Sequence, residues 1–419
     1  MESIAYEDAL RIVLAQCRPL PSEIVGISQS GGRVLARSFR AREDDPPQPK
    51  SGMDGFALQS KDTAPATPER PITLSFDEVV GAGHQALREV APGQAVRIMT
   101  GALLPPGADA VVKQEHTRSN GPGRFSVTVP LNPGQNVVPV GAHLRAGTLL
   151  QEAGEVLTPH GVSLLAGQGL AQIPVHRRPR VGLLALGDEL VVPGGELAPG
   201  QIFVSNPYLL EALAREAGAE PVLLGVVPDS LEVIEARLRQ ALGGGQGQPP
   251  CEVVVTLGGS HLGDFDFGWK VQDRLGAQVR FQRVRLNIGG SSLFGTLGDA
   301  LCFGLPGPPP AAWIGFETLV RPALLKLGAR TQTQRPQFRA ALTVPMFIPS
   351  GRMHFIPARL YLAPDQEPRV TPLPRGVALP RPAHLLANAL IRVGEEGLNL
   401  TAGEGVTVDW LEIPAPPLG

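Results

Sequence analysis

The sequence predicts a multidomain α/β protein in which an alternating α/β region lies between two β-rich regions. Three observations support this fold class. The chain has 419 residues, which is enough for two to four domains. Its 50 glycines and 43 prolines are dispersed without a period, as in a protein with many turns and short strands. Between residues 181 and 327, strand-like apolar runs alternate with helical patterns, which favours a mostly parallel sheet with helices on both faces.

Charge and cysteine content narrow the functional classes. The formal net charge of −2 gives no electrostatic support for binding nucleic acid or an anionic membrane. Cys17, Cys251 and Cys302 are far apart, and none belongs to a C-x-x-C pair, so we expect reduced, buried thiols. The N-terminus lacks a signal pattern, and no run of about 18 apolar residues occurs. These features predict a cytoplasmic protein.

The N-terminal part predicts helices on either side of a β-rich stretch. Apolar positions at helical spacing indicate a helix over residues 3–17, with Ser3 as its N-cap. A second helix is expected over residues 22–37. Short runs bounded by Pro, Gly or Asn then predict strands over residues 72–76, 95–99, 110–114 and 125–129. A short helix around residues 160–167 and an extended piece before Arg178 complete this part.

The α/β region is predicted to bind a ligand at the carboxyl ends of its strands. Strands are expected over residues 181–186, 221–227, 251–257, 279–287 and 300–305. Helices are expected over residues 207–218, capped by Asn206, and over residues 230–242, 271–275 and 311–327. Ligands of such sheets bind beyond the carboxyl ends of the strands. Three of these ends carry glycine or carboxylate residues, namely Gly187-Asp188-Glu189, Gly258-Gly259-Ser260 and Leu305-Pro306-Gly307.

The C-terminal region returns to β-structure. Strands are expected over residues 338–344, 359–362, 389–393 and 405–412. Their number and length predict a small barrel or a sandwich.

The segment Ser51-Gly52-Met53-Asp54-Gly55-Phe56 places a carboxylate between glycines. Glycine allows unusual backbone conformations and close approach of a ligand to the main chain. The segment alone is compatible with an ordinary surface turn. Its context favours an active-site acid, because an ordered series of further motifs follows along the chain.

Those motifs together resemble one family. They are Arg97-Ile98-Met99-Thr100-Gly101-Ala102, Pro105-Pro106-Gly107-Ala108-Asp109-Ala110, Lys113-Gln114-Glu115, Leu186-Gly187-Asp188-Glu189-Leu190, Leu257-Gly258-Gly259, Asp264-Phe265-Asp266-Phe267 and Leu305-Pro306-Gly307. The ordered set closely resembles the molybdopterin molybdenumtransferase family, which includes bacterial MoeA and the E domains of gephyrin and of the plant molybdenum-cofactor protein. The resemblance covers essentially the whole chain.

The resemblance implies a domain arrangement. A linking domain would comprise residues 1–44 and 145–178, with a β-rich domain of residues 45–144 inserted into it. A MogA-like α/β domain that binds molybdopterin would follow over residues 179–330, and a barrel-like β domain over residues 335–419.

It also implies a reaction and partners. Adenylylated molybdopterin and molybdate would react with help from Mg²⁺ or another divalent cation, giving molybdenum cofactor and AMP. Family members are homodimers whose cleft lies between the α/β domain of one subunit and the inserted domain of the other. An upstream molybdopterin adenylyltransferase or a full-length homologue is a further expected partner.

Site residues follow from the matching motifs. The resemblance assigns catalytic roles to Asp54, Thr100, Glu189 and Asp266, and metal binding to Asp188 and Glu189. It assigns substrate binding to Gln114, Glu115, Ser205, Asn206, Gly258, Gly259, Pro306 and Gly307. Two of these residues have structural alternatives, since Glu115 also fits a salt-bridged strand end and Asp188 a helix cap.

Several positions depart from the family pattern. The two lysines of the K-P-G-K-P segment are replaced by Asn287 and Gly290. Other polar positions of the family are occupied here by His143, Leu186, Val204, His261, Pro308 and Ala311, and a serine-rich loop is replaced by Arg381-Pro382-Ala383-His384. These replacements raise a second hypothesis, in which the chain is a catalytically impaired paralogue that binds molybdopterin or acts as a scaffold in a heterodimer.

Nearby residues offer compensation for the lost lysines. Arg283, Arg285 and Asn287 alternate on the predicted strand 279–287, so their side chains would share one face. Arginine suits phosphate and oxyanions, and Arg285 is the candidate for part of the lysine function, with a solvated edge-strand arginine as the alternative. His143 and His261 are either new metal ligands or tolerated replacements.

Overall fold

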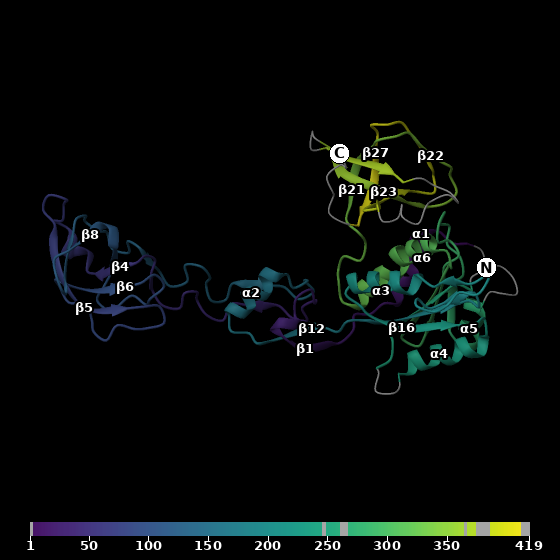
Figure 1. The fold of residues 1–419 in the computed structure, drawn as a ribbon, viewed down its shortest axis with the longest axis horizontal. Coiled ribbons are helices and arrows are strands. Elements are labelled where there is room, and N and C mark those ends of the chain that lie inside the picture. Colours follow the sequence, from purple (N-terminus) through teal and green to yellow (C-terminus); the bar gives the residue numbers. More distant parts are fainter. Residues whose placement is uncertain (1–2, 245–248, 260–266, 364–366, 374–385, 412–419) are drawn as a thin grey trace. The chain divides into compact units, whose positions relative to one another are not determined.

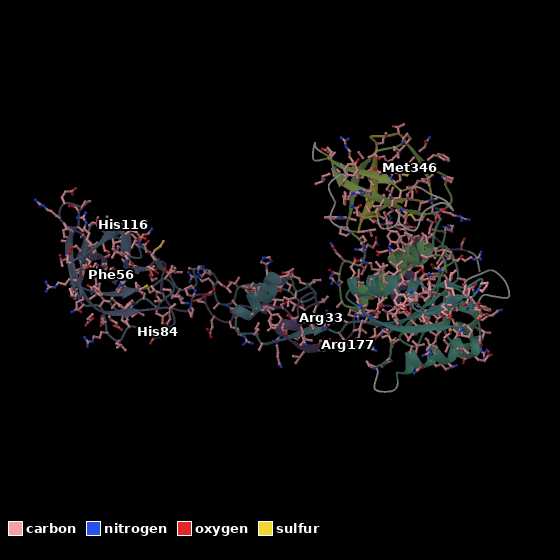
Figure 2. The ribbon with its side chains drawn as sticks, in the orientation of Figure 1. Arg33, Phe56, His84, His116, Arg177 and Met346 are labelled. Atoms are coloured by element: carbon pink, nitrogen blue, oxygen red, sulfur yellow. The ribbon has the colours of Figure 1, made fainter. Side chains whose placement is uncertain are left out.

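The computed structural model describes residues 3–244, 249–259, 267–363, 367–373 and 386–411. The chain forms two compact units. The first comprises Met1–Ala36, Gly154–Thr158 and Gln172–Gly419, and the second comprises Arg37–Ala153 and Pro159–Ala171. Both segments of the predicted linking domain, 1–44 and 145–178, are thus divided between the units. The figures draw the fold as a ribbon and with its side chains (Figures 1 and 2).

The second unit is built around a six-stranded sheet with the order β7-β4-β6-β5-β9-β8. Its strands are β4 (Gly55–Leu58), β5 (Ile72–Val80), β6 (Gln94–Ile98), β7 (Ala110–Lys113), β8 (Thr117–Ser119) and β9 (Arg124–Val127). The four predicted strands are confirmed. In its core, Phe56 stacks on Phe125 with ring centroids 3.8 Å apart, and Phe76 packs edge-on against both rings. Aromatic pairs of this kind add to the stability that apolar burial provides.

Shorter elements surround this sheet. They are β2 (Phe39–Arg40), β3 (Lys50–Ser51), the 3₁₀ turns η2 (Ser60–Thr63) and η3 (Gln114–His116), β10 (Val137–Val138), β11 (Leu149–Gln151) and α2 (Pro159–Gly167). Helix α2 confirms the helix predicted around residues 160–167. Strand β3 pairs with β10, and β2 pairs with β11.

The first unit begins with α1 (Tyr6–Gln16), which confirms the first predicted helix. The predicted cap is wrong, because Ala5 occupies the N-cap position and Ser3 does not cap the helix. The helix predicted over residues 22–37 is also wrong. The chain there forms β1 (Ser22–Gly26) and the 3₁₀ turn η1 (Ile27–Gln29), and β1 pairs with β12 (Gln172–His176). Pairing with a strand about 150 residues later overrides the local helical pattern.

The central sheet of this unit has the order β16-β13-β17-β20-β19-β18. Strands β13 (Arg180–Leu186), β16 (Glu220–Val227), β17 (Val253–Leu257) and β20 (Ala300–Leu305) are parallel. At one edge, β19 (Leu293–Leu297) pairs antiparallel with β20, and β18 (Gln278–Phe281) pairs antiparallel with β19. The small strands β14 (Leu190–Val191) and β15 (Ile202–Phe203) pair beside it. The predicted mostly parallel sheet is confirmed.

Helices cover both faces of the sheet, as Figure 1 shows. They are α3 (Asn206–Glu216), α4 (Leu231–Gly243), α5 (Phe267–Leu275), α6 (Pro309–Gly315), the π-helical turn η4 (Phe316–Val320) and α7 (Arg321–Leu327). Val253, Val255 and Leu257 of β17 face the core with α1, α3, α6 and α7, whereas Val254 faces the core with α4 and α5. A strand buried on both faces explains the continuous apolar runs in the sequence.

Two predicted elements need correction. The strand expected over residues 279–287 ends at Phe281, and only isolated bridges from Val284 to Ile4 and from Leu286 to Met353 follow. Both residues are buried, so the apolar alternation reflects burial against two different segments. The expected cap of α3 is also displaced by one residue, because Ser205 is the N-cap and the Asn206 amide donates to the Gly307 carbonyl oxygen at 2.6 Å.

The C-terminal region is a closed five-stranded barrel, which decides between the predicted barrel and sandwich. Its strands are β21 (Gln337–Leu342), β23 (His354–Leu362), β24 (Pro368–Pro372), β25 (Ala389–Val393) and β27 (Gly405–Trp410), with β22 (Met346–Ile348) and β26 (Leu398–Leu400) paired beside it.

The three cysteines are free and buried, as predicted. Burial raises the pKa of the Cys17 and Cys302 thiols to about 12. None of the helices in the described ranges is long and apolar enough to cross a membrane.

Candidate functional site

The Asp54 turn lies where three strand ends of the inserted sheet meet. Asp54 directly precedes β4, and Gly55 is paired with Ile98 at the end of β6 and with Lys113 at the end of β7. Because β4 is antiparallel to both neighbours, its first residue lies beside their last residues. Thr100 and Gln114, which follow those two strands, are therefore brought next to Asp54.

Hydrogen bonds fix this arrangement. Oδ1 of Asp54 accepts from the backbone N–H of Thr100 and from its hydroxyl, both at 2.7 Å. The backbone N–H of Gln114 donates to the Asp54 carbonyl oxygen at 3.1 Å. The two Thr100 bonds, the backbone one first, lower the pKa of the Asp54 carboxyl, with a smaller contribution from Arg97. Asp54, Thr100, Gln114 and Glu115 are all exposed, so an ionised carboxylate is presented to solvent in a fixed orientation.

Gly55 is required at the start of β4 for steric reasons. A Cβ at this position would lie 1.8 Å from the carbonyl oxygen of Val112 in the paired strand. Ser51 closes the other side of the turn, since its hydroxyl donates to the Met53 carbonyl oxygen at 2.6 Å. The glycine that the sequence motif contains is thus a close-approach residue rather than a flexible one.

A cavity of about 440 Å³ opens at the carboxyl ends of β13, β17 and β20. Six predicted site residues line it, namely Glu189, Ser205, Asn206, Gly258, Gly259 and Gly307. Gly258 has a φ of 97°, and a Cβ there would lie 2.7 Å from the Leu186 carbonyl oxygen. Main-chain groups therefore approach the cavity closely, which suits a ligand held by backbone N–H donors.

Two carboxylates, Glu189 and Asp229, line this cavity, and Asp188 lies next to Glu189 in the chain. Asp188 and Glu189 are exposed at the end of β13, and Asp229 lines the cavity from the loop after β16. The backbone N–H of Asp229 donates to Oδ1 of Asp188 at 3.3 Å. In the described ranges, no group of three or more His, Cys, Asp or Glu side chains is arranged to hold a metal ion by itself. Oxygen donors that leave coordination positions open fit Mg²⁺, which commonly binds one or two carboxylates together with substrate phosphates.

A second cavity, of about 790 Å³, surrounds the segment that replaces the family lysines. Asn287, Gly290 and the predicted Pro306 line it, and Pro308 lines both this cavity and the first. Its cationic residues are Arg283, Arg285 and Arg352.

The three arginines differ in their contacts. Nε of Arg285 lies 3.0 and 3.1 Å from the two carboxylate oxygens of Glu395, and one Nη atom donates to the Ser3 carbonyl oxygen. Arg283 and Arg352 form no ion pair with any residue that the structure describes. The charge of Arg285 is therefore largely offset within the protein, whereas the other two remain available to an anion.

Some predicted residues are not brought to these cavities, and some cavity residues were not predicted. Asp266, His261 and the segment 381–384 lie outside the described residues. His143 is exposed in the other unit and belongs to no metal-binding cluster there among the described residues. Sequence reasoning missed Asp229 and Arg352, which come from loops without a motif. The position of Asp229 directly after a strand of the parallel sheet is the signal that could have identified it.

Comparisons with known proteins identify the family of the chain. The profile of the MoeA N-terminal region (domain I and II) matches residues 4–169, and the profile of a probable molybdopterin binding domain matches residues 182–326. The Bacillus subtilis molybdopterin molybdenumtransferase is 37% identical over 77% of this chain and 74% of its own. The Haemophilus influenzae molybdopterin molybdenumtransferase is 32% identical over 93% of this chain and 94% of its own.

A comparison with solved structures also finds a MoeA protein. A molybdopterin biosynthesis MoeA protein from Pyrococcus horikosii superposes with a TM-score of 0.82 at 29% identity, covering 98% of this chain and all of that one. The hypothesis of a non-catalytic paralogue gains no support from relatives that are named transferases. The strand-end cavity, the anchored Asp54 turn and these similarities together establish that the chain belongs to the molybdopterin molybdenumtransferase family, whose role is in molybdenum cofactor biosynthesis.

Proposed function

We propose that this protein inserts molybdate into adenylylated molybdopterin and releases AMP. One observation carries the proposal beyond family membership. A carboxylate-bearing cavity at the strand ends adjoins an arginine-lined cavity, and the two share Pro308. The reaction needs both environments, because a divalent cation requires oxygen ligands while molybdate and phosphate require cations.

In this proposal the first cavity binds the nucleotide-linked substrate. The backbone around Gly258, Gly259 and Gly307 would approach its phosphates, and Ser205 and Asn206 would line its ring systems. Asp188 and Glu189 would hold Mg²⁺, with Asp229 beside them. When bound, the cation would polarise the phosphoanhydride that is broken.

The second cavity would bind the oxyanion. Arg283 and Arg352 would replace the charge that Asn287 and Gly290 lack, since a guanidinium fork matches tetrahedral oxyanions. Arg285 would contribute mainly by shaping the cavity through its contacts with Glu395 and Ser3.

The Asp54 turn would contribute a carboxylate to the reaction. Oδ1 is used by Thr100, which leaves Oδ2 to accept a proton donor of the substrate or to contact a cation. Gln114 and Glu115 would contact the substrate beside it. We further infer a homodimeric, cytoplasmic protein. Three free, buried thiols are compatible with that compartment.

The direct test is reconstitution in vitro. Purified protein would be mixed with adenylylated molybdopterin, molybdate and MgCl₂, and AMP and molybdenum cofactor would be quantified. We expect molybdate-dependent AMP release that an excess of chelator abolishes. AMP release no faster than in a control without protein would contradict the proposal.

Substitutions in the second cavity test the assignment of the oxyanion. Arg283→Gln and Arg352→Gln should each raise the KM for molybdate about tenfold, because removing one positioned cation costs on the order of 1.4 kcal/mol or more. Arg280→Gln is the matched control, since Arg280 is an exposed arginine of the neighbouring strand β18 and does not line the cavity. Equal KM values in all three variants would contradict the assignment.

A further inference from the structure

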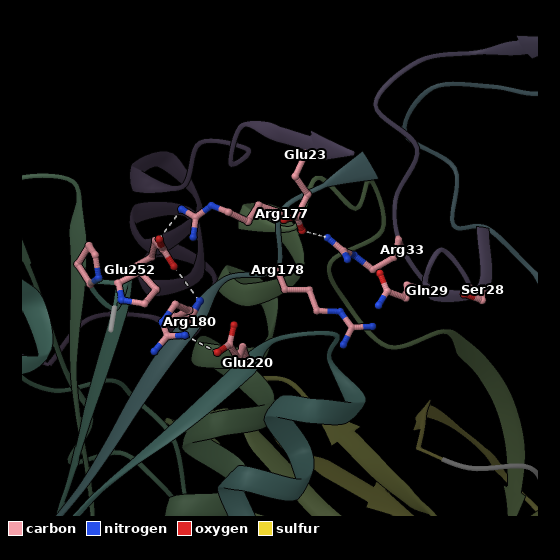
Figure 3. A pocket seen from close by; sticks show the side chains of 12 residues that line it. Glu23, Ser28, Gln29, Arg33, Arg177, Arg178, Arg180, Glu220 and Glu252 are labelled. Atoms are coloured by element: carbon pink, nitrogen blue, oxygen red, sulfur yellow. Dashed lines mark hydrogen bonds and ion pairs between the residues drawn. The ribbon is translucent and has the colours of Figure 1, made fainter. Parts of the chain in front are cut away.

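A third cavity lies in the first compact unit, at the end of the central sheet where its parallel strands begin. It has a volume of about 880 Å³ and is shown in Figure 3. Arg180 and Glu220 begin β13 and β16, and Glu252 directly precedes β17, so the cavity opens at the amino ends of the parallel strands. Arg33, Arg177 and Arg178 line it from the segments next to β1 and β12. We propose that this cavity binds a phosphorylated small molecule through Arg178.

Three carboxylates of the cavity are already neutralised. Glu252 pairs with Arg177 at 2.6 Å and accepts the backbone N–H of Arg180 at 2.7 Å. Glu23 pairs with Arg33, and Glu220 pairs with Arg180. Both of these arginines are more than nine-tenths buried, so the ion pairs form fixed walls. Figure 3 shows the pairs as dashed lines around the cavity.

Arg178 is the fourth arginine of the cavity and takes part in none of these ion pairs. Figure 3 shows its side chain between those of Arg33 and Glu220. It is exposed, and it forms no ion pair with the residues that the structure describes. Four arginines against three glutamates leave one net positive charge in the cavity. A phosphate group supplies the missing counter-charge and matches the planar donors of a guanidinium.

The rest of the lining indicates a ligand larger than free phosphate. Ser28 and Gln29 of the turn η1 add polar groups, and Pro249 and Pro250 form an apolar wall. The glutamate oxygens on the walls can accept hydrogen bonds from hydroxyl groups. The volume lies in the range of small-molecule sites. A phosphate ester that carries hydroxyl groups, such as a nucleotide or a sugar phosphate, has this combination of groups.

This site is separate from the proposed reaction. Strand β13 has seven residues and spans roughly 20 Å from its amino end, at this cavity, to its carboxyl end, at the first cavity. The proposal therefore does not depend on transferase activity, and it can fail or succeed independently of it.

Arginine footprinting tests the site in the unmodified protein. Phenylglyoxal would modify exposed arginines, and mass spectrometry would give the modification rate at each position. Inorganic phosphate or AMP at about 10 mM, roughly ten times the Kd of a millimolar ligand, should slow modification of Arg178 about fivefold or more. Stronger protection by AMP than by phosphate supports a phosphate ester as the ligand, whereas equal protection would contradict a ligand larger than free phosphate. Arg88, whose side chain is 79% exposed in the other unit, should keep its rate and is the internal control.

Two further outcomes would overturn the proposal. One is an unchanged rate at Arg178 with both probes, and the other is equal protection by adenosine, which lacks the phosphate group. A variant series gives a second measurement. In an Arg352→Gln background, which weakens the proposed oxyanion cavity, Arg178→Gln should weaken binding of inorganic phosphate about tenfold, and Arg178→Lys should weaken it less. Equal affinity in the three proteins would also count against the site.

Discussion

At the residue scale, the hydrogen bonds from Thr100 to Asp54 set the charge and orientation of the Asp54 carboxylate. Thr100 donates twice to the same oxygen of Asp54, and both bonds favour the charged form of the carboxyl. Because folding lowers this pKa, the bonds stabilise the folded state above the ordinary Asp pKa. That contribution is lost as the pH falls through the lower, folded-state pKa. The carboxylate therefore remains ionised at all pH values near neutrality.

Thr100→Val should raise the pKa of Asp54 toward its ordinary value, because the hydroxyl bond is lost and the backbone bond remains. Carbon-13 NMR titration of the Asp54 carboxyl gives this pKa directly. If the ionised form is needed for turnover, the acidic limb of the activity profile should move to higher pH as well.

Thr117→Val is the control for that experiment. The Thr117 hydroxyl donates to the Gln114 carbonyl oxygen at 2.7 Å and does not contact Asp54. An Asp54 pKa that is equal in the wild type and in Thr100→Val would show that the threonine side chain does not hold the charge.

At the element scale, close strand packing explains the glycine of the motif. Gly55 begins β4 between β6 and β7, and the Val112 carbonyl oxygen occupies the space of a side chain. Gly55→Ala should destabilise this unit by about 2 kcal/mol or more, because a backbone atom has to move. Thermal and urea unfolding would measure the loss.

Gly167→Ala provides the comparison within the same unit. Gly167 ends α2, and a Cβ added to it would have no atom of the surrounding structure within 4 Å. Its substitution should leave stability within about 1 kcal/mol of the wild type or increase it. Equal unfolding midpoints for the two variants would argue against steric exclusion at Gly55.

The wrong element predictions belong to this scale too. Residues 22–37 carry a helical pattern, yet β1 forms there because it pairs with β12. The alternation through Val284 and Leu286 indicates a strand, yet these residues are buried against Ile4 and Met353 in two separate segments. Local periodicity reports which side chains are buried, but it does not report the partner that buries them.

At the scale of the whole molecule, two residues with proposed roles belong to different compact units. Asp54 belongs to one unit and Glu189 to the other. If the site is shared between the subunits of a homodimer, Asp54→Asn and Glu189→Gln should each abolish activity, and mixed dimers should restore it. Random exchange of equal amounts gives one intact site in half of the dimers, or about a quarter of wild-type activity.

Co-expression with two affinity tags would isolate the mixed dimer for that assay. Each variant expressed alone is the control for residual activity. A mixed dimer without activity would place Asp54 and Glu189 of the same chain in one site, and an absence of mixed dimers would contradict the proposed oligomeric state.

The sequence by itself determined the family, the mostly parallel sheet and the strand ends that carry the first cavity. These features depend on motifs and on periodic burial, which short stretches of sequence record. Tertiary structure alone decided that Glu395 pairs with Arg285, 110 residues away, and that Arg352 reaches the same cavity. It also decided that the Asn206 amide bonds to Gly307 instead of capping its own helix. Such contacts join segments that are distant in sequence, and packing of the whole chain selects them.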